Sequence, residues 1–327
     1  MAARRIPLNL FGVAFGLAGL SGSWAAAARA GHVPDTVGRA LLALSALAWV
    51  LVVAAYGRYV FTTRGAFAAD LRDTALSPFA SLAVITPMVF GAQGLRLFWA
   101  GGATVVVDVF LVLTLVLGGW LTGQWIYGEM NFDTVHPGYF LPTAAGGLIA
   151  AASAADVGQV RLGEIMLGLG VICWVMIGSV ILARLFARPL PPPALQPTLA
   201  IEVAPAPVAT LGYLAINGDH IDGIAAAFAG YGLLMVVAQL RLMPLFVRLS
   251  FAPGLWAFTF SWAAVATVTL RWIEYGRPAG HLVYTYLVLA AVTLLVGGML
   301  VRTCVALARR QLLPPQPAPP AAGHPGT

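Results

Sequence analysis

Long apolar segments dominate the chain and alternate with short polar connections. A transmembrane helix needs about 20 mostly apolar residues. Ten segments meet that requirement, and we expect their ends to be accurate to within a few residues. They cover residues 7–30, 37–61, 76–98, 102–127, 138–157, 162–187, 197–217, 221–246, 253–275 and 280–308. The pattern predicts an all-α polytopic membrane protein in which residues 1–310 form one ten-helix transmembrane domain.

The remaining residues, 311–327, are rich in proline and cannot form a hydrophobic core, so we expect a disordered tail. Only 9% of the residues are charged, whereas soluble domains contain about 25%. All 18 basic residues are arginines, and they lie at the ends of the apolar segments. This distribution is typical of membrane topology rather than of a basic binding surface. An ordinary soluble enzyme and a nucleic-acid partner are thereby excluded.

The arginines also predict an orientation. With a cytoplasmic N-terminus, twelve of them lie on the inner side and six on the outer side. Because cytoplasmic loops are enriched in basic residues, we expect both termini in the cytoplasm and an even number of spans. The absence of lysine, with abundant Ala, Gly and Arg, indicates a GC-rich genome, and the compact termini favour a bacterial protein and hence the inner membrane.

The prolines divide the ten spans into two kinds. Every proline within or opening a span belongs to an odd-numbered span, and the odd spans open at Pro7, Pro78, Pro137, Pro197 and Pro253. A repeat of about 60 residues, with one proline-bearing and one plain helix, predicts five helical hairpins.

Proline inside a transmembrane helix is best tolerated where the helix is buried in protein or lines a wet cavity. We therefore expect an inner ring of five odd-numbered helices around a central pore and an outer ring of five even-numbered helices. Pro87, Pro142 and Pro205 are the predicted kinks of the pore-lining helices. An alternative is that these prolines only permit close packing between helices.

Four stretches in the odd spans carry a family resemblance, and they cover residues 6–20, 136–143, 204–207 and 254–261. They read IPLNLFGVAFGLAGL from Ile6, HPGYFLPT from His136, APAP from Ala204 and GLWAFTFS from Gly254. Together they resemble the TehA family, which includes bacterial tellurite-resistance and dicarboxylate transporters and has plant slow-type anion channels as relatives. The resemblance extends over about residues 6–308.

The resemblance implies a homotrimer of ten-helix protomers, each with a pore for small inorganic or organic anions. In the family a phenylalanine of the ninth helix plugs the pore, and the matching residue is Phe260. A glycine of the first helix lies against that plug, and Gly16 is the best match. Spacing alone does not choose between Phe258 and Phe260, since they point about 200° apart on a helix.

Charged residues bear on the mechanism. No arginine lies at mid-depth in a span, so we expect a weakly binding pore whose mouths are enriched in Arg. Arg96 and Asp108 approach from the same side and could form an ion pair. Glu202 lies about five residues into the seventh span; either it pairs with Arg241 or it is an intramembrane protonation site.

The sequence therefore predicts an anion channel gated by a phenylalanine plug. The alternative is a proton-coupled secondary transporter of tellurite or C4-dicarboxylates. We expect no enzymatic activity, cofactor or metal, because the five histidines are dispersed and no catalytic or phosphate-binding motif is present. The expected partners are small anions and the lipid bilayer.

Overall fold

The computed structural model describes residues 5–128 and 130–313, and within these ranges the chain is all-helical, with no β-strand. Ten of its helices are long and apolar enough to span a membrane. In chain order they are Leu8–Arg29, Asp35–Thr62, Ser77–Leu97, Ala100–Tyr127, Pro137–Asp156, Val160–Ala187, Gln196–Ile216, Gly223–Arg241, Pro253–Gly276 and His281–Ala308. The predicted segments are confirmed to within a few residues, apart from the end of the eighth.

The eighth span ends at Arg241 rather than at residue 246. A separate short helix, α10 (Met243–Phe246), follows it, with Pro244 in its first turn. Proline has no N–H to donate to the carbonyl four residues earlier, and its ring clashes with that carbonyl, so the regular hydrogen bonding of α9 (Gly223–Arg241) does not continue through Pro244.

The even-numbered spans are single α-helices, and the odd-numbered spans are composite. The even spans are α2 (Asp35–Thr62), α5 (Ala100–Tyr127), α7 (Val160–Ala187), α9 and α12 (His281–Ala308). The α-helical parts of the odd spans are α1 (Phe11–Arg29), α4 (Ser81–Val89), α6 (Gly146–Asp156), α8 (Pro205–Ile216) and α11 (Ala257–Gly276).

Short 3-10 segments open every odd span: η1 (Leu8–Leu10), η2 (Ser77–Ala80), η6 (Pro137–Phe140), η8 (Gln196–Val203) and η9 (Pro253–Trp256). The third span also contains the π-helical η3 (Phe90–Gly94) and the 3-10 turn η4 (Leu95–Leu97), and the fifth contains the π-helical η7 (Leu141–Ala145). The sequence reason is proline, which lacks an N–H and interrupts the regular α-helical hydrogen bonds.

Burial separates the two kinds of span. Within an 18-residue apolar stretch of each odd span between 61 and 78% of the residues are buried, against 11 to 28% in the corresponding stretch of each even span. Each odd span contacts the even span that follows it, and each also contacts the next odd span; α11 in turn contacts α1. The exposed faces of the even helices are apolar, as a lipid-facing surface requires.

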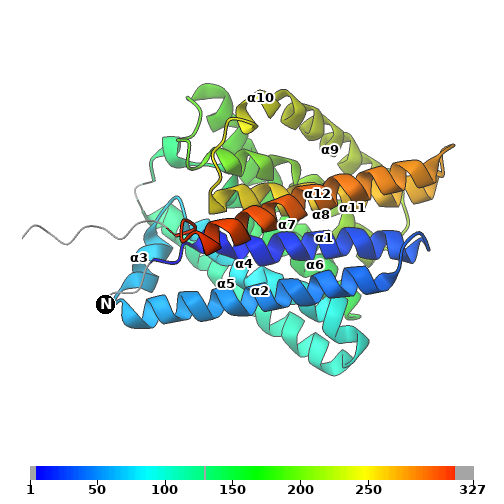
Figure 1. Cartoon of the computed structure of the whole chain (residues 1–327), viewed down its shortest axis with the longest axis horizontal. Helices are drawn as coiled ribbons and strands as arrows, with labels where there is room; N and C mark the ends of the chain where they lie inside the picture. Colours follow the sequence, from blue (N-terminus) through cyan, green and yellow to red (C-terminus); the bar gives the residue numbers. More distant parts are fainter. Residues whose placement is uncertain (1–4, 129, 314–327) are drawn as a thin grey trace, which may run out of the picture.

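Both ends of the described chain lie at the same end of the helix bundle, as Figure 1 shows by the dark blue and red segments. At this end Arg5 forms ion pairs with Asp70 (2.8 Å) and Asp73 (3.1 Å), which tie the chain start to α3 (Ala66–Arg72) and the turn after it. Leu312 and Leu313 pack against a buried cluster. The rest of the predicted tail, from residue 314, lies outside the described residues.

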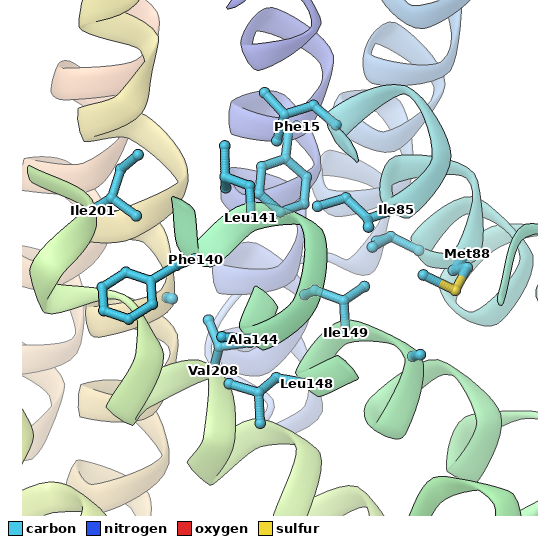
Figure 2. Close-up of a cluster of buried hydrophobic side chains, with 14 of the residues drawn as sticks. Phe15, Ile85, Met88, Phe140, Leu141, Ala144, Leu148, Ile149, Ile201 and Val208 are labelled. Carbon is cyan, nitrogen blue, oxygen red and sulfur yellow. The ribbon is translucent and has the colours of Figure 1, made fainter. Parts of the chain in front are cut away.

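The main hydrophobic core joins the odd spans. In Figure 2, Phe15 of α1, Ile85 of α4, Leu148 of α6 and Val208 of α8 converge on one cluster of buried side chains. Four successive odd spans are thereby packed against one another, and this packing positions the cavities described next.

Candidate functional site

A cavity of about 580 Å³, which we term the wide cavity, opens at the end of the bundle opposite the N-terminus. All five odd spans contribute to its wall. Its charged residues are Arg29, Asp35, Arg96, Asp156, Asp219 and Arg271. They lie at or beyond the C-terminal ends of the odd spans, so the charges gather at the mouth, and the small side chains Gly19, Gly22 and Ala264 line its depth.

A second cavity of about 40 Å³, which we term the narrow cavity, lies toward the N-terminal end. All five odd spans line it, and no residue of an even span does. Its wall is almost entirely apolar and includes Phe79, Phe140 and Ile201, with Asn9 and Ser261 as its polar side chains.

Phe260 is at the boundary between the two cavities, since it lines both, as does Val208. Its ring stacks on that of Phe15, with centroids 3.6 Å apart and planes inclined by 13°. Phe15 is buried and lines the narrow cavity. Sequence reasoning missed Phe15, because an aromatic residue in an apolar run gives no signal that separates it from ordinary packing.

The packing of α11 decides which aromatic side chain faces the cavities. Phe258 lies on the other face and makes an edge contact with Phe246 of α10, with centroids 4.8 Å apart. Trp256 is buried and donates a hydrogen bond from Nε1 to Thr303 Oγ1 of α12 at 2.9 Å. These contacts fix the rotation of α11, which spacing in the sequence left open.

Of the two glycines, Gly19 has Phe260 among its nearest neighbours, whereas the nearest neighbours of Gly16 are Thr259 and Trp256. A Cβ atom at Gly19 would be 3.0 Å from Phe260 Cδ2. A Cβ atom at Gly16 would instead meet Thr259, with 2.8 Å to its Cβ, and the Trp256 ring at 2.9 Å. Gly16 thus allows α1 and α11 to approach, while Gly19, one turn later, leaves room for the ring.

The three predicted kink prolines are all at departures from regular α-helix. Pro87 lies in α4, just before η3. Pro142 lies within η7, where its carbonyl oxygen faces Gly118 of α5 so closely that a Cβ there would be 2.8 Å away. Pro205 opens α8 and is the only one of the three to line a described cavity, the narrow one.

Glu202 and Arg241 are not paired in the described part of the chain. Glu202 is 6% exposed, and neither of its carboxyl oxygens has a hydrogen-bonding partner there. Arg241 is exposed at the end of α9. The neighbours Ile201 and Ala204 line the narrow cavity but Glu202 lines neither cavity.

The environment of Glu202 is the contact between η8 and α9. One helical turn before it, the Leu199 carbonyl accepts a hydrogen bond of 2.6 Å from Gln239 Nε2 of α9. Because Glu202 is buried and lines neither cavity, its carboxyl group lies within this helix packing.

The charges at the mouth of the wide cavity differ in how they are compensated. Arg271 pairs with Asp219. The sequence suggested an ion pair between Arg96 and Asp108, but the described part of the structure does not contain it. Arg96 instead donates a hydrogen bond to the main-chain carbonyl of Asp156 at 2.5 Å, and Asp108 accepts one from Gln159 at 3.1 Å.

His136 stands at the start of the fifth span and is fully buried. Its Nδ1 accepts a hydrogen bond from the Gly138 N–H at 3.1 Å, which caps η6. Burial lowers the pKa of His136 to about 4, so the side chain is neutral at physiological pH. Within the described residues no three His, Cys, Asp or Glu side chains are grouped to hold a metal ion.

Comparison with known proteins gives two matches. The sequence model of the SLAC1 family, described as voltage-dependent anion channels, matches residues 5–304. The tellurite resistance protein TehA homolog of Haemophilus influenzae is 30% identical over 273 residues, which cover 80% of this chain and 79% of that protein.

Proposed function

Since the chain belongs to the SLAC1 family of voltage-dependent anion channels, we propose that it is a channel for small anions with Phe260 as its gate. In this proposal the anion path runs through the wide cavity, past Phe260, and on through the narrow cavity. The observation that carries the proposal is that Phe260 borders both cavities.

The contacts between spans support a central pore. The odd spans contact one another in the order 1–3–5–7–9, and the ninth contacts the first. A closed series of contacts of this kind encloses an axis, and the residues of both cavities come mainly from these five spans. We infer an inner ring of five odd helices with five even helices outside it, arranged as five hairpins.

The chemistry of the walls supports passage rather than tight binding. Among the described residues no charged side chain lines the narrow cavity, and conduction requires that an ion leave as easily as it arrives. An apolar ring across such a path excludes water and hence ions. Because Phe260 lines both cavities, we expect that moving its ring aside joins them.

The assembly and orientation are part of the same proposal. We place the protein in a bacterial inner membrane with both termini in the cytoplasm, on the distribution of arginines. The wide cavity then faces outward. A homotrimer with one pore in each protomer follows from the family resemblance.

A second candidate is a proton-coupled transporter of tellurite or C4-dicarboxylates. The Haemophilus influenzae relative is named for tellurite resistance, which favours tellurite as the substrate, and the buried, unpaired carboxyl group of Glu202 favours proton coupling. Against it, Glu202 lines neither cavity, and a coupling group is expected beside the substrate path.

The test is anion flux from liposomes, with chloride and nitrate, for the wild type, Phe260→Ala and Phe258→Ala. Low flux in the wild type and in Phe258→Ala, with a large anion-selective increase in Phe260→Ala, is the expected result. Folded Phe260→Ala protein that does not conduct, with tellurite or malate uptake driven by a pH gradient, would overturn the channel in favour of the transporter.

A further inference from the structure

The arginines expected on the outer side of the membrane fall into two groups in the structure. Three of them form ion pairs with an acidic residue three or four positions away in the chain. These pairs are Arg39 with Asp35, Arg161 with Glu164 and Arg277 with Glu274. Arg29, Arg96 and Arg271 line the wide cavity. Only the second group lines the space that an ion would enter.

Arg29 has the least compensated charge of the second group. Within residues 5–128 and 130–313 its guanidinium forms no hydrogen bond and no ion pair, whereas Arg271 has Asp219 and Arg96 has a main-chain carbonyl. Arg29 nevertheless lines the same cavity as Arg96, Asp156 and Arg271. Its five N–H donors are free for a ligand.

Asp156 opposes the arginines from α6. It is half-buried in the same wall, and its carboxylate forms no ion pair among the described residues. A carboxylate near two guanidinium groups competes with any anion that approaches them and lowers its affinity. The wide cavity thus contains arginines that attract anions and a carboxylate, that of Asp156, which competes with the anions for them.

We propose that Arg29, supported by Arg96, forms a weak capture site for small inorganic anions in the wide cavity, and that Asp156 limits the time an anion stays there. The inference rests on the proposed channel function for its physiological meaning. Its physical content, a positive potential and an anion site at Arg29, holds whether or not the pore opens.

Three features support a weak site of this kind. The cavity of about 580 Å³ is large enough for a hydrated anion. Asp35 and Asp219 are neutralised by Arg39 and Arg271, so Arg29 and Arg96 face only Asp156, and this excess of positive charge raises the local concentration of anions. Asp156 keeps that effect moderate, which suits a conducting path because strong binding would hold the ion.

The test measures the potential in the wide cavity directly. Ala152, one turn before Asp156, lines the cavity and is half-buried. In a background in which Cys173 and Cys304 are replaced by Ala, Ala152→Cys is treated with an anionic sulfonatoethyl or a cationic trimethylammonioethyl methanethiosulfonate. The ratio of the two reaction rates reports the local potential without any need for conduction.

Arg29→Gln is expected to lower the anionic-to-cationic ratio by about fivefold, and Asp156→Asn to raise it similarly. The matched control is Arg161→Gln, because Arg161 has a 92% exposed side chain and lies outside the cavity. Nitrate should slow the anionic reagent when Arg29 is present and lose this effect in Arg29→Gln.

An equal shift of the ratio in Arg161→Gln would overturn the site, as would a ratio that Arg29→Gln leaves unchanged or an Ala152→Cys thiol that reacts with neither reagent. Failure of the channel is seen separately, as Phe260→Ala protein that does not conduct while the ratio still depends on Arg29. If Phe260→Ala protein conducts but the reaction-rate ratio does not depend on Arg29, the proposed channel stands and the proposed capture site is wrong.

Discussion

The rings of Phe15 and Phe260 stack almost in parallel, with centroids 3.6 Å apart. Phe15 comes from α1 and Phe260 from α11, two helices that contact each other along much of their length. In the proposed channel the closed path therefore depends on a pair of aromatic rings from two helices and not on one side chain. Motion of Phe260 requires that this stacking be broken.

We predict that Phe15→Ala raises anion flux, though less than Phe260→Ala does. Stacked aromatic pairs are worth about 0.5–1.5 kcal/mol, so losing the pair should raise the fraction of open channels by about two- to tenfold. The double variant should conduct no more than Phe260→Ala alone, since Phe15 acts through that ring. Liposome flux with nitrate measures all three variants.

Phe15→Leu is the control for packing, because Phe15 is 4% exposed and a full truncation leaves a void. The leucine keeps most of the volume and removes the stacking. An increase in flux with Phe15→Leu would assign the effect to stacking, and additive increases in the double variant would contradict the pairing.

A substitution at Gly19 is predicted to lower anion flux rather than raise it. In the Phe260→Ala background, Gly19→Val should restore part of the block, because its side chain projects into the space that the ring had occupied. The distance of 3.0 Å from the Gly19 Cβ position to Phe260 Cδ2 supports this direction. Flux through liposomes that contain the double variant should fall below that of Phe260→Ala.

Gly16 should behave differently, because its Cβ position meets Thr259 and Trp256. Gly16→Ala is expected to destabilise the protein by about 1–3 kcal/mol through overpacking of α1 against α11. Thermal unfolding in detergent measures this loss. Equal melting temperatures for Gly16→Ala and wild type would show that the two helices separate without cost.

The spans were predictable from sequence because each is one long apolar run, and membrane depth sets its length. The odd and even kinds were also predictable, since proline is visible in the sequence and has a direct effect on the backbone. The exception, the end of the eighth span, also follows from a proline, Pro244, which the hydropathy of the segment had masked.

Side-chain registers were not predictable in the same way. Gly16 and Gly19 are one helical turn apart on the same face, so sequence reasoning could identify the face but not the turn. The pairing of Glu202 with Arg241 failed for a similar reason, since proximity to one membrane surface says nothing of rotation about the helix axis. Phe15 carried no distinguishing signal at all.

His136 predicts a pH dependence of stability. Its pKa is about 4 in the folded protein because of burial and about 6.5 when unfolded. Between pH 4 and 6.5 the unfolded state binds more protons than the folded state. The contribution of His136 to the free energy of unfolding is therefore fully present above about pH 6.5 and is lost as the pH falls toward 4. The difference corresponds to at most about 3 kcal/mol.

His136→Asn should reduce this loss, because asparagine can accept the hydrogen bond from the Gly138 N–H and does not titrate. His220→Asn is the matched control, since His220 is exposed. Melting temperatures in detergent between pH 7.5 and 4.5 supply the comparison. A pH profile unchanged by His136→Asn would mean that other groups cause the acid sensitivity.

Glu202 separates the channel from the transporter. Both of its carboxyl oxygens are buried without partners in the described structure, and a neutral amide of the same shape removes the cost of a buried charge. For a channel we expect Glu202→Gln to conduct as before in the Phe260→Ala background and to melt at an equal or higher temperature. For a proton-coupled transporter, the same change should abolish uptake driven by a pH gradient. Arg241→Gln is the companion variant, and it should alter neither property, because Arg241 is exposed and not paired with Glu202 in the described structure.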